Sequence, residues 1–99
     1  MQTYVILRRN FWNNAEALEI SASISARVGA EEMPDQVKWI RSYVVREEDE
    51  NGTEKLGTVC IYRGTSAEAV REHARRVGMP ADEVIPVSNL VVVNDDTEL

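Results

Sequence analysis

Four short segments of the chain carry the β-branched, aromatic and other apolar residues that are typical of β-strands. Residues 3–8 are apolar on both parities, which predicts a central strand that is covered on two faces. Residues 36–47 and 56–63 follow, and the acidic stretch between them contains Asn51-Gly52, a strong signal for a hairpin turn. A last strand is expected over residues 84–93.

Two other segments place apolar residues at helical spacing. The first follows Asn13, a candidate N-cap, and is expected to end at Gly29. The second follows the capping-box pattern of residues 65–68 and is stopped by Gly78 and Pro80. The apolar stripes are Ala17, Ile20, Ile24 and Val28 in the first helix, and Ala67, Val70, Ala74 and Val77 in the second.

The predicted order of elements is β-α-β-β-α-β in a single domain over residues 1–99, with residues 94–99 as an acidic tail. This order predicts the ferredoxin-like α+β plait, a four-stranded antiparallel sheet with both helices on one face. The other face would be bare, although Trp39, Tyr43 and Tyr62 are available to it. Monomeric proteins rarely expose so large an apolar patch. We therefore expect a homodimer that forms through the open sheet face.

Composition and charge narrow the classes of partner. Acidic residues outnumber basic ones by 17 to 11, which gives a net charge of −6 and disfavours binding to nucleic acid. The longest apolar run, residues 90–93, is far too short to span a membrane. The chain has a single cysteine, Cys60, so we expect a reducing, cytoplasmic location.

Chemistry could rest on the only histidine, His73, and on Cys60. His73 lies beside the apolar stripe of the second helix, so it is either a core histidine bonded to a backbone carbonyl or a metal ligand. Cys60 lies in the third strand, where a free thiol usually behaves as a small buried side chain. A site with more than one such ligand needs both residues together or two chains. The acidic hairpin, residues 47–55, lacks calcium-loop spacing and is expected to be solvated.

Three blocks of the sequence resemble a known family. Residues 38–44 (KWIRSYV), 59–62 (VCIY) and 70–82 (VREHARRVGMPAD) are similar to a bacterial family of small ferredoxin-like proteins, mostly of unassigned function, that includes a nickel-binding protein. The resemblance covers residues 3–93. It implies a dimer with nickel or another divalent transition metal at or near its interface, and His73 and Cys60 match the motif residues. It does not indicate an enzyme, and we assign no catalytic residue.

Two functions are therefore open. The first is a small cytoplasmic metal-binding or metal-responsive protein with His73 as the principal ligand, paired with Cys60 or with a carboxylate. The alternative is a small-molecule-binding or enzymatic dimeric module. Its aromatic-lined cavity would include Trp39, Tyr43, Cys60 and Tyr62, with His73 moving protons if it reaches that cavity.

Overall fold

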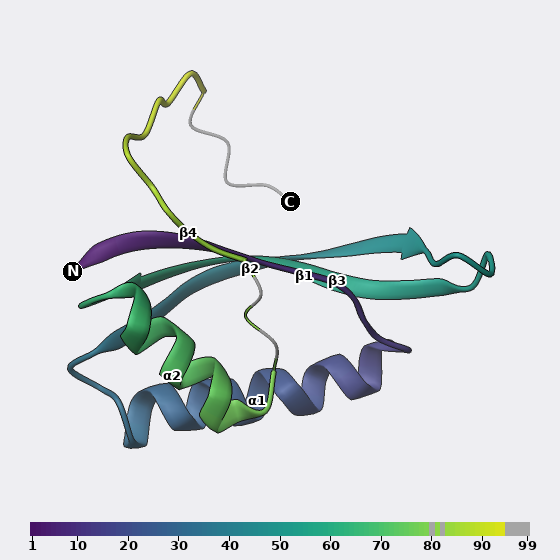
Figure 1. The fold of residues 1–99 in the computed structure, drawn as a ribbon, viewed down its shortest axis with the longest axis horizontal. Coiled ribbons are helices and arrows are strands. Elements are labelled where there is room, and N and C mark those ends of the chain that lie inside the picture. The colour runs from purple at the N-terminus through teal and green to yellow at the C-terminus, as the bar shows by residue number, and fades with distance from the viewer. Residues whose placement is uncertain (80, 82, 95–99) are drawn as a thin grey trace.

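The computed structural model describes residues 1–79, 81 and 83–94. It contains strands β1 (Gln2–Trp12), β2 (Val37–Glu48), β3 (Glu54–Gly64) and β4 (Glu83–Pro86), and helices α1 (Ala15–Glu31) and α2 (Ala67–Val77). The strands form an antiparallel sheet in the order β2-β3-β1-β4. Both helices lie against one face of this sheet (Figure 1). The ferredoxin-like plait predicted from the sequence is confirmed.

Helix α1 differs from its prediction at both ends. Asn14 rather than Asn13 is the N-cap, and its side chain accepts a hydrogen bond of 2.9 Å from the backbone N–H of Ala17. The helix continues through Gly29 to Glu31. Ile20, expected in the apolar stripe, is exposed, and the polar Ser25 is buried. Ser25 faces inward because its hydroxyl has a hydrogen-bond partner in the sheet, the hydroxyl of Tyr62.

Helix α2 ends at Gly78 as predicted, but its N-cap is Ser66, one residue later than the Thr65 that the capping-box pattern of residues 65–68 predicts. The Ser66 hydroxyl accepts a hydrogen bond from the N–H of Ala69 at its start, and Gly78 ends it in the left-handed conformation with φ of 83°. Arg75 and Arg76 both bond to Glu72 in the last turns. These two guanidinium groups hold the pKa of Glu72 at about 2. Both arginines are therefore paired with an acid on their own helix.

The acidic hairpin has a structural use for one of its carboxylates. Gly52 has φ of 76°, the positive value that the turn at Asn51-Gly52 requires of glycine. The Asp49 side chain accepts hydrogen bonds of 2.9 Å from the N–H groups of Asn51 and Thr53. Such a side chain stands in for a backbone acceptor within a turn.

A β-bulge in β2 overturns the predicted faces of two aromatic residues. Trp39 lies opposite Tyr62, yet the next paired residue, Arg41, lies opposite Ile61. Ile40 is therefore an extra residue, and an extra residue reverses the alternation of side chains that follows it. Trp39 faces the helices and Tyr43 faces away from them, whereas the sequence predicted one face for both. Of the three aromatic residues expected on the open face, only Tyr43 lies there.

The two faces of the sheet are both apolar. The helix-covered face holds the core, which comprises Tyr4, Ile6, Met33, Val37, Cys60, Tyr62, Ala69, Val70 and Val84. The open face carries the residues of opposite parity in the paired strands: Val5, Leu7, Tyr43, Val45, Val59, Ile61 and Ile85. Tyr43 and Ile85 are exposed there. An apolar open face thus exists, as predicted, although with a different set of residues.

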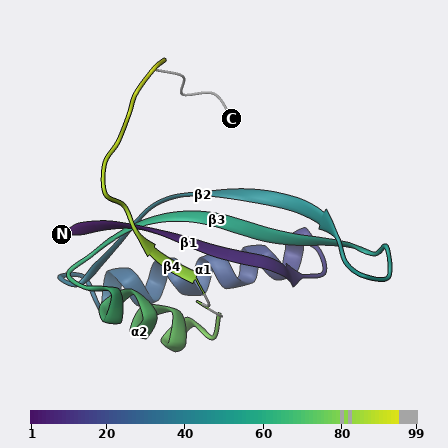
Figure 2. The same cartoon turned by 45° about the horizontal axis from the view of Figure 1, so that its top comes forward.

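Strand β4 is shorter than predicted. It ends at Pro86 rather than Val93, and the N–H of Val87 makes one further bond to the carbonyl oxygen of Thr3. Pro86 lies opposite Tyr4, and a proline has no backbone N–H to donate to a neighbouring strand. Residues 87–94 leave the sheet on the side opposite the helices (Figures 1 and 2). Residues 95–99, most of the predicted acidic tail, lie outside the described residues.

No helix in the described ranges is long and apolar enough to cross a membrane.

Candidate functional site

A cavity of about 250 Å³ lies between the sheet and α1. Successive covered-face residues of β3 (Thr58, Cys60 and Tyr62) form part of its wall, because side chains two apart in a strand share a face. The other lining residues come from the neighbouring strands, from α1 and from the end of α2: Arg8, Trp12, Leu18, Ala22, Ser25, Trp39, Ser42, Val44 and Met79. Three of the four residues predicted to line the cavity, Trp39, Cys60 and Tyr62, do line it. Tyr43 does not, because the bulge turns its side chain to the open face.

Polar groups converge on Cys60 in this wall. The Sγ atom accepts a hydrogen bond of 2.9 Å from the Ser42 hydroxyl and one of 3.5 Å from Nη1 of Arg8. Arg8 is buried, although its side chain carries a guanidinium group. Thr58 is buried beside it, and its hydroxyl has no hydrogen-bond partner among the described residues. An apolar cavity with a few convergent polar groups is typical of a small-molecule site.

Two aromatic rings continue this sheet wall toward one end of the cavity. Trp39 lies parallel to Tyr62, with ring centroids 6.2 Å apart and planes 7° apart. The Trp39 indole Nε1 donates a hydrogen bond of 2.7 Å to the hydroxyl of Ser42. Trp39 is 36% exposed and Val44 is 51% exposed, whereas the deeper lining residues are buried. The mouth of the cavity therefore lies along β2, and Trp39 is at the mouth rather than fully in the core.

Ser25 connects the sheet to both helices at the floor of this region. Its hydroxyl shares a hydrogen bond of 2.9 Å with the Tyr62 hydroxyl, and its carbonyl oxygen accepts one of 3.0 Å from Nε2 of His73. Burial raises the pKa of Tyr62 to about 12, and the bond to Ser25 only partly opposes this effect. Tyr62 is therefore a neutral hydrogen-bonding residue throughout the physiological range of pH.

His73 is a core residue that is 1% exposed. A carbonyl oxygen can only accept, so Nε2 carries the hydrogen and the neutral ring leaves its lone pair on Nδ1. Nδ1 is buried and has no hydrogen-bond partner among the residues that the structure describes. Burial lowers the pKa of His73. The ring also forms part of a groove of about 520 Å³ between α1 and the start of β2, but it is not among the residues that line the smaller cavity.

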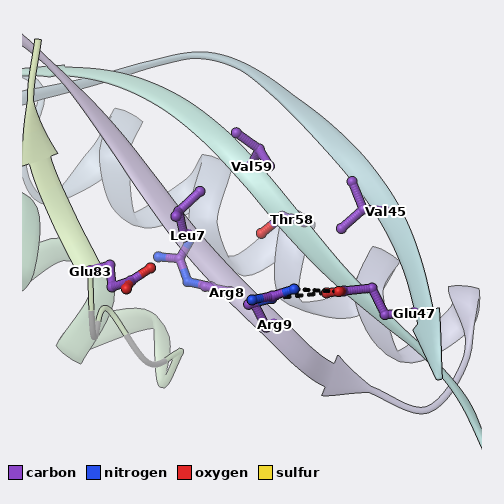
Figure 3. Close-up of a pocket in the computed structure, with 8 residues that line it drawn as sticks. All are labelled: Leu7, Arg8, Arg9, Val45, Glu47, Thr58, Val59 and Glu83. Carbon is purple, nitrogen blue, oxygen red and sulfur yellow. Dashed lines mark hydrogen bonds and ion pairs between the residues drawn. The ribbon is translucent and has the colours of Figure 1, made fainter. Parts of the chain in front are cut away.

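A second hollow, of about 800 Å³, lies on the open side of the sheet. Leu7, Val45 and Val59 form its apolar floor, and the ion pair of Arg9 with Glu47 crosses one end of it (Figure 3). The hydrogen bonds from Arg9 lower the pKa of Glu47. This hollow is larger than the cavity under the helices, and Arg9, Glu47 and Glu83 make its rim charged.

The sequence predictions missed four polar residues that line the cavity between the sheet and α1: Arg8, Ser25, Ser42 and Thr58. Arg8 could have been found, because it shares its parity in β1 with the core residues Tyr4 and Ile6. Thr58 likewise shares its parity with Cys60. Ser42 could not have been placed without knowledge of the bulge.

Comparison with known proteins now decides the family. The family model described as nickel responsive protein SCO4226-like matches residues 4–87. The chain belongs to the SCO4226-like family. Among solved structures, the crystal structure of SCO4226 from Streptomyces coelicolor A3(2) is 21% identical, with a TM-score of 0.65 over 90% of this chain and 99% of that one. This likeness shows that the two share their fold. No curated protein matches the chain.

Membership of the SCO4226-like family raises the question whether this chain's residues fit nickel. Within the described ranges, no group of three or more His, Cys, Asp or Glu residues could hold a metal ion. The Nε2 atom of His73 is engaged by Ser25, so Nδ1 is the one atom of this ring left to ligate a metal, and the Sγ atom of Cys60 faces the guanidinium of Arg8. A neighbouring cation disfavours a second one. The fold as described therefore does not fit a nickel site, and the assignment of His73 and Cys60 as metal ligands stays a prediction.

The buried neutral His73 predicts a specific dependence of stability on pH. Its pKa in the folded chain lies below the ordinary value of 6.5, so below pH 6.5 the unfolded chain binds a proton that the folded chain does not. The free energy of unfolding should therefore fall between pH 7 and pH 5, by at most about 1.4 kcal/mol per pH unit. Urea unfolding at a series of pH values measures this slope.

The control for this prediction is His73→Gln. The chain has one histidine, so the variant should lose the slope between pH 7 and pH 6, above the range in which Glu47 and Glu72 take up protons in the unfolded chain. An unchanged slope in His73→Gln would show that another group is responsible.

Proposed function

We propose that this member of the SCO4226-like family binds a small aromatic molecule in the cavity between the sheet and α1. The observation that carries the proposal is the arrangement of the wall. The buried Arg8, Thr58 and Cys60 and the half-buried Ser42 line the same space as the stacked rings of Trp39 and Tyr62. Planar rings offer stacking surface to a planar ligand, and the polar set fixes its orientation.

The cavity limits the size and chemistry of the ligand. Its volume of about 250 Å³ is below the roughly 300–1,000 Å³ that is usual for drug-sized molecules. Arg8 can only donate hydrogen bonds, and the Thr58 hydroxyl is able to donate as well. A single substituted ring with one acceptor group, such as a carboxylate or a phenolic oxygen, matches the Thr58 hydroxyl, which has no hydrogen-bond partner among the described residues.

The geometry supports binding rather than a reaction. A nucleophilic cysteine needs a base within hydrogen-bond reach, but Cys60 is bonded to Ser42 and Arg8. His73, the one histidine, is engaged by the carbonyl of Ser25 and is not part of the cavity wall. The proton-transfer role considered for His73 therefore has no support from its position.

Benzoate and p-cresol are suitable probes for this proposal. Both tryptophans of the chain, Trp12 and Trp39, line the cavity, so binding should quench intrinsic fluorescence with a saturable dependence on probe concentration. Ala22→Leu adds bulk to the cavity wall and should weaken binding at least tenfold. Ser23→Leu is the matched control, since Ser23 is exposed on the same helix and should leave binding unchanged.

Two results would contradict the cavity proposal. One is the absence of a saturable change with either probe in the folded wild type. The other is equal binding by wild type and Ala22→Leu, with circular dichroism showing that the variant keeps its helices.

A second candidate function is the binding of nickel or another divalent transition metal. Its support is the description of the family as nickel responsive and the predicted ligands His73 and Cys60. Both residues lie on the helix-covered face, so a site that joins the ligands of two chains at the open face cannot use them without rearrangement. Because the described residues do not fit the metal, this candidate ranks below the cavity.

Calorimetric titration of tag-free protein with nickel separates the two candidates. The metal proposal requires that His73→Ala abolish binding. The cavity proposal expects the same heat for wild type and His73→Ala, because any nickel bound would be held elsewhere. Circular dichroism must show that the variant is folded.

A cytoplasmic location is also part of the proposal. It rests on the presence of a single, buried thiol, Cys60, which is compatible with a reducing compartment.

A further inference from the structure

The cavity between the sheet and α1 adjoins the groove of about 520 Å³ that His73 borders. Two residues, Ser25 of α1 and Trp39 of β2, line both spaces. The hydroxyl of Ser25 is bonded to that of Tyr62 across the two layers, so the inner side of the junction is closed. Trp39 is 36% exposed, so the two spaces meet on the outer side, along its indole ring.

The sheet residues of the two spaces lie in one row. Thr58, Cys60 and Tyr62 line the cavity from the covered face of β3. Trp39 lies opposite Tyr62, and Val37, the neighbouring covered-face residue of β2, lines the groove. Side chains two apart in a strand share a face, so this row leads from the Thr58 hydroxyl at the cavity to the groove.

Small side chains on one face of α1 leave room for an elongated space. The helix residues that line the cavity or the groove recur at the three- and four-residue intervals of one helix face: Leu18, Ala22, Ser25, Ala26, Gly29 and Ala30. From Ala22 in the cavity to Ala30 in the groove the helix rises about 12 Å, at 1.5 Å per residue. A single aromatic ring occupies only part of that length.

The lining of the groove is suited to an aliphatic chain. Alanine, glycine, proline and valine residues form most of it. His73 is neutral there because burial lowers its pKa, and its Nε2 is already bonded to the carbonyl oxygen of Ser25. Lys38 also borders the groove, but it alternates with Trp39 in β2, so its charged side chain starts on the open face. The groove therefore favours an uncharged, apolar chain.

We propose that the cavity and the groove form one site for a phenol that carries an unbranched aliphatic tail. This proposal rests on the function proposed above and names the ligand class of the same site. The ring lies against Trp39 and Tyr62, and the phenolic oxygen accepts a hydrogen bond from the Thr58 hydroxyl, which has no partner among the described residues. The para position then points along the row toward the groove. The tail crosses the exposed edge of Trp39 and lies between Val37 and Gly29.

Two phenols of different length test the groove. p-Cresol occupies the cavity alone, whereas 4-pentylphenol carries a tail that enters the groove. The wild type should bind 4-pentylphenol at least tenfold more tightly than p-cresol, measured by quenching of the tryptophan fluorescence. Gly29→Leu should remove this gain and leave the affinity for p-cresol unchanged. A Cβ atom at Gly29 lies 3.5 Å from Nε2 of His73, an ordinary contact, and leucine favours a helix more than glycine does, so the variant should fold.

Ser23→Leu is the matched control for Gly29→Leu. It adds the same side chain at an exposed position of α1 that lines neither space, so it should keep both affinities. Two results would overturn the groove proposal and leave the cavity proposal standing: no gain for 4-pentylphenol in a wild type that binds p-cresol, or a gain that persists in Gly29→Leu. Absence of binding by both phenols would overturn both proposals.

The ring of His73 shows independently where the tail lies. It borders the groove but does not line the cavity, and it is the one histidine of the chain, so its imidazole proton resonances are distinct in the nuclear magnetic resonance spectrum. Saturation with 4-pentylphenol should shift these resonances, and p-cresol should shift them much less. Equal shifts from the two phenols, or none from 4-pentylphenol, would contradict a tail in the groove.

Discussion

The extra residue in β2 is the constraint on which the rest of this structure depends. Side chains of a regular strand alternate between faces, so Trp39 and Tyr43 would share a face if β2 were regular. The bulge at Ile40 places Trp39 with Tyr62 and Cys60 under the helices, and it turns Arg41 and Tyr43 to the open side. This single extra residue therefore places Trp39 at the mouth of the cavity between the sheet and α1, and it places the exposed Tyr43 on the open face.

Ser25 then fixes how the helices sit on this face. Its hydroxyl bonds to Tyr62 of the sheet and its carbonyl oxygen bonds to His73 of α2. An unpaired buried polar group costs about 1–3 kcal/mol, so a rotation of α1 that breaks both bonds would be strongly disfavoured. These two bonds hold α1 in one orientation, although its serines give it only a modest intrinsic propensity to form a helix. The space beside α1 is therefore a defined cavity.

The order of elements, the hairpin turn and the end of α2 were predictable because their signals are local. Gly78 acts within one turn of itself, and Asn51-Gly52 acts within four residues. The start of α2 was predicted one residue too early, because Thr65 and Ser66 are both suitable caps. The bulge was not predictable, since nothing in the sequence around Ile40 marks an unpaired residue. The length of β4 was overestimated because the apolar run of residues 90–93 is typical of a strand, although β4 ends at Pro86.

The same contrast applies to the candidate site. His73 was placed correctly beside the apolar stripe, and its bond to a backbone carbonyl was one of two open readings. Which reading holds depends on Ser25, a residue 48 positions away in sequence. The description of the family names nickel, yet His73 and Cys60 of this chain are both buried, so the family description and the side-chain geometry favour different functions.

The proposed cavity requires that Trp39 lie on the helix-covered face, and a nuclear Overhauser spectrum of the folded protein tests that placement directly. The account predicts cross-peaks between the indole protons of Trp39 and the ring protons of Tyr62, with none between Trp39 and the ring of Tyr43. Cross-peaks from Trp39 to Tyr43, with none to Tyr62, would show that β2 is regular and would contradict the account.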